Sequence, residues 1–195
     1  MSDLAETTSK TALRAAALAR RDALGSEQRA AAASALAARG LPFQVAPGSV
    51  VSGYMAMRGE LDPLPLMQAL AARGARLALP AIVARDLPLR FRAWAPGDDL
   101  IRGQFGTSEP PPEAPEFSPD IMLVPLAAFD RLGHRIGYGA GHYDRSIAQL
   151  RQSQRVIAVG IGFAMQQIEA VPASAHDVGL DYVLTETDSF DFRSP

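Results

Sequence analysis

The 195-residue sequence contains no cysteine. This absence excludes disulfides, thiolate metal sites and cysteine nucleophiles, and it is compatible with a reducing compartment. Long hydrophobic runs are also absent. The longest stretch of small apolar residues, AAAASALAA, lies between Arg29 and Arg39 and is far shorter than the roughly 20 residues that a membrane-spanning helix needs. Residues 1–9 are polar and do not resemble a secretory signal. We therefore expect a cytoplasmic protein with no membrane partner.

The sequence has no excess of positive charge. Its formal net charge is -2 and its pI is about 5.9, which argues against broad electrostatic binding to nucleic acid but allows a local basic pocket. Histidine is scarce, and the three histidines have no spacing that is typical of a catalytic triad or a metal site. The composition is that of an ordinary globular protein. We expect one domain over residues 1–195, with residues 1–8 disordered, and a monomer or weak dimer.

Predicted strands alternate with predicted helices along the chain. This order favours an α/β fold: a single domain with a mostly parallel open sheet and helices on both faces, as in a Rossmann-like three-layer sandwich. The proline-rich segment 103–119 is predicted to be a long loop. Helices are expected over residues 9–24, 26–39, 63–75 and 141–151, and strands over 49–55, 76–80, 89–95, 120–125, 155–162 and 181–185.

A glycine-rich stretch, RIGYGAGHYDRSI (135–147), follows the strand predicted over residues 120–125. Ligands of open α/β sheets bind beyond the carboxyl ends of strands, which is where this stretch lies. The spacing matches neither a Walker A loop nor G-x-G-x-x-G. Two interpretations remain open: the glycines make a tight strand-to-helix turn, or their N–H groups bind a phosphate. Asp144 and Arg145 favour the phosphate, because they supply a Mg²⁺ ligand and a permanent positive charge.

The segment GYGAGHYDR (137–145) resembles the glycine-rich signature of the 5-formyltetrahydrofolate cyclo-ligase family, approximately GYGGGYYDR. Other stretches agree with the family in the same order. KTALR (10–14) resembles its N-terminal K-x-x-x-R, and GYMAMRGELDPLPLMQAL (53–70) resembles its tyrosine-to-glutamate segment. LRFRAWAPGDDLIRGQFGTSEP (89–110) and the tail over residues 162–186 also fit. The resemblance thus extends over most of the chain.

The chain departs from the family signature at two positions. Ala140 stands where glycine, or lysine in some members, is usual, and His142 stands where tyrosine or phenylalanine is usual. Alanine is compatible with this loop unless φ is positive there. Without a lysine in the loop, more of the phosphate charge is left to Lys10, Arg14 and Arg145.

The resemblance implies ATP-dependent conversion of 5-formyltetrahydrofolate to 5,10-methenyltetrahydrofolate, with Mg²⁺ and with release of ADP and phosphate. It implies that ATP phosphorylates the formyl oxygen and that N10 then attacks the activated carbon. Lys10 and Arg145 would be catalytic, and Asp144 would hold the metal. The implied substrate-binding residues are Met55, Glu60, Trp94 and Tyr143. The implied ATP-binding residues are Lys10, Thr11, Ala12, Leu13, Arg14, Arg135, Ile136, Gly137, Tyr138, Gly139, Ala140, Gly141, His142, Tyr143, Asp144 and Arg145.

Two other functions are compatible with parts of this pattern. A folate- or nucleotide-binding relative without turnover would keep the binding residues, and a sugar-phosphate isomerase on a similar scaffold would not depend on ATP. The joint presence of Lys10, Arg14, Glu60, Asp144 and Arg145 favours the enzyme, because binding alone would not need groups for both Mg²⁺ and the γ-phosphate. The substrate is then a small molecule, with or without a polyglutamate tail.

Overall fold

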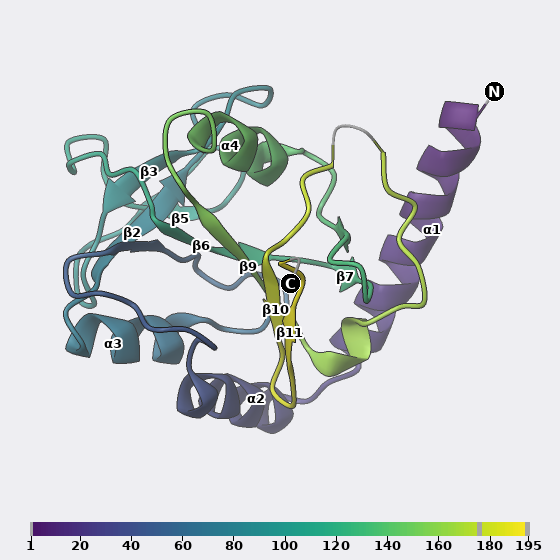
Figure 1. The fold of residues 1–195 in the computed structure, drawn as a ribbon, viewed down its shortest axis with the longest axis horizontal. Coiled ribbons are helices and arrows are strands. Elements are labelled where there is room, and N and C mark those ends of the chain that lie inside the picture. Colours follow the sequence, from purple (N-terminus) through teal and green to yellow (C-terminus); the bar gives the residue numbers. More distant parts are fainter. Residues whose placement is uncertain (1, 175–176, 194–195) are drawn as a thin grey trace.

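The centre of the molecule is a seven-stranded sheet with the strand order β11-β10-β9-β6-β1-β2-β3 (Figure 1). The computed structural model describes the backbone of residues 2–174 and 177–193, and their side chains from Lys10 onward. The five inner strands are parallel, and β3 and β11 pair antiparallel at the edges, so the predicted mostly parallel α/β sheet is confirmed. The strands are β1 (Val50–Ser52), β2 (Arg76–Ala81), β3 (Arg90–Ala93), β6 (Ile121–Pro125), β9 (Ile157–Ile161), β10 (Tyr182–Leu184) and β11 (Ser189–Asp191).

Helices cover both faces of this sheet, as predicted. α2 and α3 pack on one face, where Leu36 and Leu66 share a core with Leu123 of β6. α4 packs on the opposite face, where Ile147 meets Met122 of β6. β6 serves both cores because successive side chains of a strand point to opposite faces. The helices are α1 (Ser2–Asp22), α2 (Ser26–Arg39), α3 (Leu64–Ala72), α4 (His142–Leu150) and the short 3-10 helix η1 (Ala164–Gln166).

α1 lies beside the sheet rather than on one of its faces (Figure 1). It packs on a two-stranded hairpin, β7 (Ala128–Phe129) and β8 (Arg135–Ile136), through a small core that contains Ala17, Ala127 and Ile136. This hairpin leads from β6 into the glycine-rich stretch, whose first two residues form β8. It therefore places the N-terminal helix next to that stretch, although the two are more than 100 residues apart in sequence.

Some boundaries differ from the prediction. The first helix was expected over residues 9–24, but α1 begins at Ser2 and ends at Asp22, and Gly25 is the N-cap of α2. The α2 prediction is confirmed at both ends, and Gly40 stops the helix with a φ of 69°. The expected disorder of residues 1–8 stays a prediction.

The proline-rich segment is not wholly without strands. β4 (Ile101–Arg102) pairs with β5 (Ser108–Glu109), so the prediction of a loop is wrong at residues 108–109. The chain can form this short pairing because Glu109 precedes the run of prolines, which lack the N–H groups that a strand needs.

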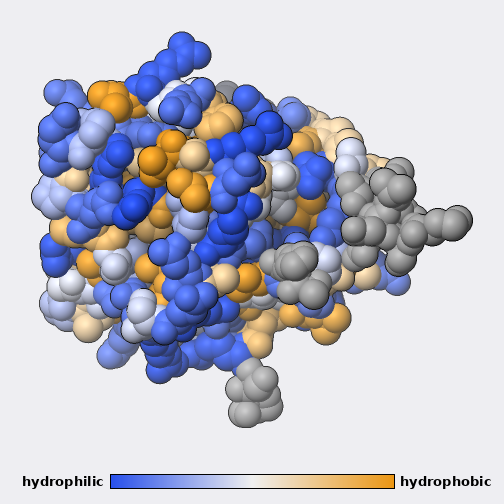
Figure 2. All heavy atoms as spheres, turned by 90° about the horizontal axis from the view of Figure 1, so that it is seen from above, coloured by the Kyte–Doolittle hydropathy of each residue, from blue (hydrophilic) through white to orange (hydrophobic). Residues whose placement is uncertain are grey.

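The surface mixes polar and apolar residues. On the face seen in Figure 2, hydrophilic residues surround small hydrophobic patches. Within the described part of the chain, no helix combines the length and the apolar character that crossing a membrane requires.

Candidate functional site

The connections from β1 and β6, which are neighbours in the sheet, lead in opposite directions. β1 connects through α3 to β2 on one side, and β6 connects through α4 to β9 on the other. A crevice at the carboxyl ends of two such strands is the usual ligand site of open α/β sheets. The loop after β1 carries Glu60, and the segment after β6 carries the glycine-rich stretch. The fold therefore brings these two candidate segments to one edge of the sheet.

The glycine-rich stretch contains two glycines that the turn requires and one that it does not. Gly139 has a φ of 99° and Gly141 a φ of 67°, both in the left-handed region that side chains disfavour. Gly137 has no positive φ, and a Cβ there would have no atom within 4 Å apart from those of its two chain neighbours. Thus the turn explains Gly139 and Gly141, whereas the space at Gly137 suits a ligand that approaches the backbone closely. Ala140 is not at positive φ, so alanine fits this loop.

Arg14 of α1 contacts the glycine-rich stretch directly. Its Nε donates a hydrogen bond of 2.7 Å to the carbonyl oxygen of Gly137. Its guanidinium is also 3.9 Å from the position that a Cβ of Gly139 would take. Among the described residues, no carboxylate forms a salt bridge with Arg14, so its positive charge is available to an anion beside the glycines.

Arg145 lies at the other end of the stretch. Its Nη2 donates to the carbonyl oxygens of Arg85 at 2.9 Å and Ala140 at 2.7 Å, and its Nη1 is 2.9 Å from where a Cβ of Gly141 would lie. It forms no salt bridge within the part of the chain that the structure describes. Two fixed and uncompensated guanidinium groups, Arg14 and Arg145, therefore flank the glycines, and this arrangement attracts anions.

Lys10, the only lysine of the sequence, is paired with a carboxylate. Its Nζ is 2.5 Å from Oδ2 of Asp177, which also accepts from the backbone N and Oγ of Ser174. Burial acts to raise the pKa of Asp177, but the hydrogen bonds from Lys10 and Ser174 outweigh it and lower the pKa. Asp177 belongs to the tail that resembles the family, but sequence reasoning assigned it no role. Its separation of 167 residues from Lys10 left no local signal for the pair.

Asp144, in the first turn of α4, is held by two hydrogen bonds to one of its oxygens. Its Oδ1 accepts from Nη2 of Arg135 at 2.7 Å and from the backbone N of Val178 at 3.0 Å. The side chain of Arg135 is only 4% exposed, and it also donates to the carbonyl oxygen of Val178. The second oxygen, Oδ2, makes no hydrogen bond to any described residue. Asp144 thus presents a fixed, free carboxylate oxygen, which is the kind of ligand that Mg²⁺ takes.

No cluster of three or more metal-ligating side chains occurs among the described residues. His176 lies outside them. Asp144 and Asp177 both act on the buried guanidinium of Arg135. Two carboxylates are enough for Mg²⁺, which usually completes its shell with water and substrate phosphates.

Glu60 ends a tight turn after β1. Arg58 has a φ of 49° and Gly59 a φ of 79°, and Oε2 of Glu60 accepts a hydrogen bond of 2.8 Å from the backbone N of Met57. Burial raises the pKa of Glu60, although the bond from Met57, the Tyr138 hydroxyl and nearby arginines partly oppose the rise. The carboxylate is therefore fixed in a partly desolvated place, where hydrogen bonds to a ligand are strong.

Two tyrosines lie near this carboxylate. Burial raises the pKa of Tyr138 and of Tyr143, and the negative charge of Glu60 raises both further. Tyr138 is 42% exposed, whereas Tyr143 packs against the core on the α4 face. Met55 packs against the core on the other face. The structure thus places flat rings and a carboxylate together.

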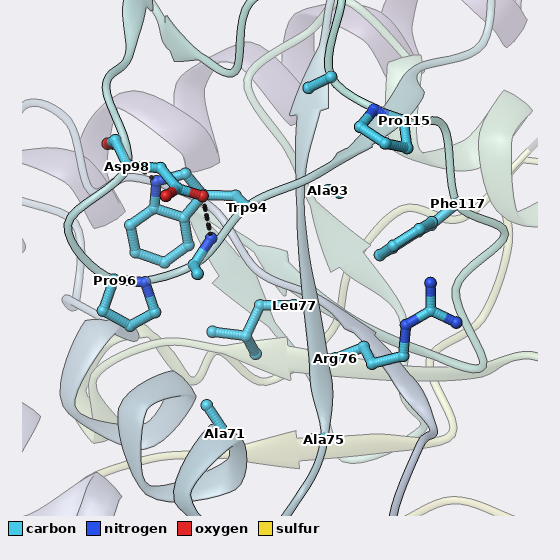
Figure 3. Close-up of a pocket in the computed structure, with 12 residues that line it drawn as sticks. Ala71, Ala75, Arg76, Leu77, Ala93, Trp94, Pro96, Asp98, Pro115 and Phe117 are labelled. Carbon is cyan, nitrogen blue, oxygen red and sulfur yellow. Dashed lines mark hydrogen bonds between the residues drawn. The ribbon is translucent and has the colours of Figure 1, made fainter.

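The structure does not bring Trp94 to this site. Its backbone N donates to the carbonyl oxygen of Leu77, near the amino end of β2, whereas Glu60 follows the carboxyl end of β1. Trp94 is 7% exposed, and with Asp98 it lines a separate cavity of about 380 Å³ (Figure 3). Trp94 is thus part of the buried core in this structure, and its predicted contact with the substrate stays a prediction.

Other predicted site residues are divided between the core and the surface. Ile136 is buried and Leu13 packs beside it, while Thr11 and Ala12 are exposed on α1. The Nδ1 atom of His142 is 3.1 Å from the carbonyl oxygen of Leu87, and its ring lies 6.3 Å from that of Phe105.

Comparisons with known proteins identify a family for this chain. The model of the 5-formyltetrahydrofolate cyclo-ligase family matches residues 6–186. A 5-formyltetrahydrofolate cyclo-ligase of Mycolicibacterium smegmatis is 35% identical, with 91% of this chain and 93% of that protein covered. One of Escherichia coli is 31% identical, with 85% and 94% covered. The solved structure of Aquifex aeolicus 5,10-methenyltetrahydrofolate synthetase superposes with a TM-score of 0.76 at 27% identity and covers 95% of this chain and 94% of that one. The chain therefore belongs to the 5-formyltetrahydrofolate cyclo-ligase family of ligases.

Proposed function

We propose that the protein converts 5-formyltetrahydrofolate to 5,10-methenyltetrahydrofolate while ATP is converted to ADP and phosphate. The observation that carries this proposal is the meeting of two half-sites at one edge of the sheet. One is the glycine-rich stretch between the uncompensated guanidiniums of Arg14 and Arg145. The other is the fixed carboxylate of Glu60 beside Tyr138 and Tyr143.

In the nucleotide half-site, positive charges would surround the transferring phosphoryl group. Phosphoryl transfer depends mainly on positioning and on stabilising charge. Backbone N–H groups of 137–141 would bind phosphate oxygens, with Arg14 and Arg145 on either side. Lys10 would exchange its contact with Asp177 for a phosphate oxygen, because its side chain is 19% exposed and its ammonium can turn on a flexible stem.

Asp144 fits a bound Mg²⁺, because one of its oxygens is free and the other is fixed. Asp177 could provide a second carboxylate. The ion would neutralise charge on the ATP phosphates. Arg135 would keep the Asp144 carboxylate in one orientation. Little conformational entropy of this side chain would then be lost when the ion binds.

In the folate half-site, Glu60 would accept two parallel hydrogen bonds from N–H groups of the pterin ring. A carboxylate has two oxygens for this purpose, and the ring of Tyr143 could provide a flat surface. These contacts would hold the formyl group, which is attached to N5 of the pterin, toward the glycine-rich stretch.

The reaction would proceed in two displacement steps. The formyl oxygen attacks the γ-phosphorus of ATP, and ADP leaves. N10 then attacks the activated carbon, loses its proton, and phosphate departs with the former formyl oxygen. Arg145 would stabilise the negative charge that moves from ATP to the departing phosphate.

The absorbance of methenyltetrahydrofolate provides the test. Product should appear only when 5-formyltetrahydrofolate, ATP and Mg²⁺ are all present. A binding relative without turnover would bind the ligands and form no product, and an isomerase would show no dependence on ATP. Product without ATP, or none from folded protein under any condition, would contradict the proposal.

A further inference from the structure

Arg21 lies in the last turn of α1, next to its final residue Asp22, and was not among the predicted site residues. Its side chain is only 2% exposed. Burying a guanidinium costs free energy unless its N–H groups donate hydrogen bonds to acceptors. The contacts of Arg21 therefore indicate why it is buried.

The guanidinium of Arg21 connects the two half-sites. Its Nη1 donates to the hydroxyl of Tyr138, in the glycine-rich stretch, at 2.7 Å. Its Nη2 donates to the carbonyl oxygen of Arg58, in the turn that ends at Glu60. Its Nε and Nη2 also donate to Oδ1 of Asp22, at 3.1 and 3.0 Å, and this exposed carboxylate offsets part of the charge. One rigid planar group thus fixes the spacing between the two loops.

We propose that Arg21 is a positioning residue for folate, which holds the Glu60 carboxylate in its binding orientation through Tyr138 and the backbone of Arg58. This inference rests on the proposed function. Electrostatics supports it, because the charge of Arg21 acts against the burial that raises the pKa of Glu60. Among the residues that the structure describes, the other charged or titratable groups that interact with Glu60 are Arg58, Tyr54, Tyr138 and Tyr143.

A double-mutant cycle on 5-formyltetrahydrofolate affinity tests the inference. Calorimetry without ATP would compare Arg21→Met, Glu60→Gln and the double variant with the wild-type protein. Arg21→Met should weaken binding about tenfold, a typical loss for hydrogen bonds to a charged group. If Arg21 acts through Glu60, the same substitution should change the Kd by less than about twofold in the Glu60→Gln background, since coupled residues are not additive.

Arg20→Met is the matched control. Arg20 is the exposed neighbour on the same helix, and among the described residues its side chain donates only to the carbonyl oxygen of Met165, at 3.4 Å. Its substitution should leave the Kd unchanged. Equal losses from Arg21→Met in both backgrounds would overturn the inference, because a general structural effect does not depend on Glu60.

Tyr138→Phe keeps the inference testable if Arg21→Met does not fold. It removes only the hydroxyl of a residue that is 42% exposed and keeps the ring. It should weaken folate binding in the wild-type background and not in the Glu60→Gln background, and additive losses would overturn the inference. Absence of folate binding by the wild-type protein would instead contradict the proposed function, and the inference with it.

Discussion

Arg145→Ala is expected to lower kcat about hundredfold, the usual loss when a charge that stabilises a transition state is removed. Its guanidinium is fixed by the carbonyl oxygens of Arg85 and Ala140 and has no carboxylate partner among the described residues. The free energy of unfolding should fall by only about 2 kcal/mol, because each of the two hydrogen bonds to carbonyl oxygens is worth about 1 kcal/mol. A native protein that is stable by roughly 5–15 kcal/mol then stays mostly folded. Steady-state kinetics and thermal unfolding of the same preparation would measure both quantities.

Arg90→Ala is a suitable control for that experiment. Arg90 lies on the edge strand β3, where it is exposed and forms a salt bridge with Glu116. Replacing Arg90 by alanine should therefore leave kcat unchanged. Arg145→Lys should recover part of the rate, since it keeps the charge without the planar fork. A fall in activity that only follows the unfolded fraction would show that Arg145 stabilises the fold and takes no part in the reaction.

Glu60→Gln is expected to weaken 5-formyltetrahydrofolate binding about 30-fold near neutral pH, because hydrogen bonds to a charged acceptor are worth roughly 2 kcal/mol. ATP affinity should change little, since the nucleotide uses the glycine-rich stretch and the cations around it. Separate titrations with each ligand would measure the two affinities. An equal loss for both ligands would mean that Glu60 supports the whole site instead of binding folate.

The pH dependence of folate binding provides a second test of the role of Glu60. Burial raises the pKa of Glu60, and the proposed contact needs the ionised carboxylate. Affinity should therefore fall as the pH drops through this raised pKa, at a higher pH than for an ordinary glutamate. The Glu60→Gln variant should lack this acid limb. If the affinity of the variant falls at low pH with the same midpoint, the group that titrates is the ligand or another residue.

Sequence patterns predicted the elements whose ends depend on residues that are close in sequence. α2 has its alanine-rich body and a glycine at its end, and both of its boundaries were predicted. The order of strands and helices predicted the sheet. The two-residue strands β4, β5, β7 and β8 were missed, because such short segments have no period to read.

Sequence reasoning found candidate site residues only where they are close in sequence or belong to a family motif. The glycine-rich stretch was found for both reasons. Asp177 and Arg21 were missed because their partners, Lys10 and Tyr138, are 167 and 117 residues away. Trp94 was assigned to the substrate by resemblance, yet the antiparallel direction of β3 takes it to the opposite end of the sheet.

The fate of the formyl oxygen tests the central claim most directly. The proposal requires that ATP activates this oxygen at the site formed by Glu60 and the glycine-rich stretch. Turnover of 5-formyltetrahydrofolate labelled with ¹⁸O in the formyl group, followed by mass spectrometry of the released phosphate, would locate the label. The account predicts that each phosphate carries the formyl oxygen. Unlabelled phosphate, with the label released into water, would contradict it.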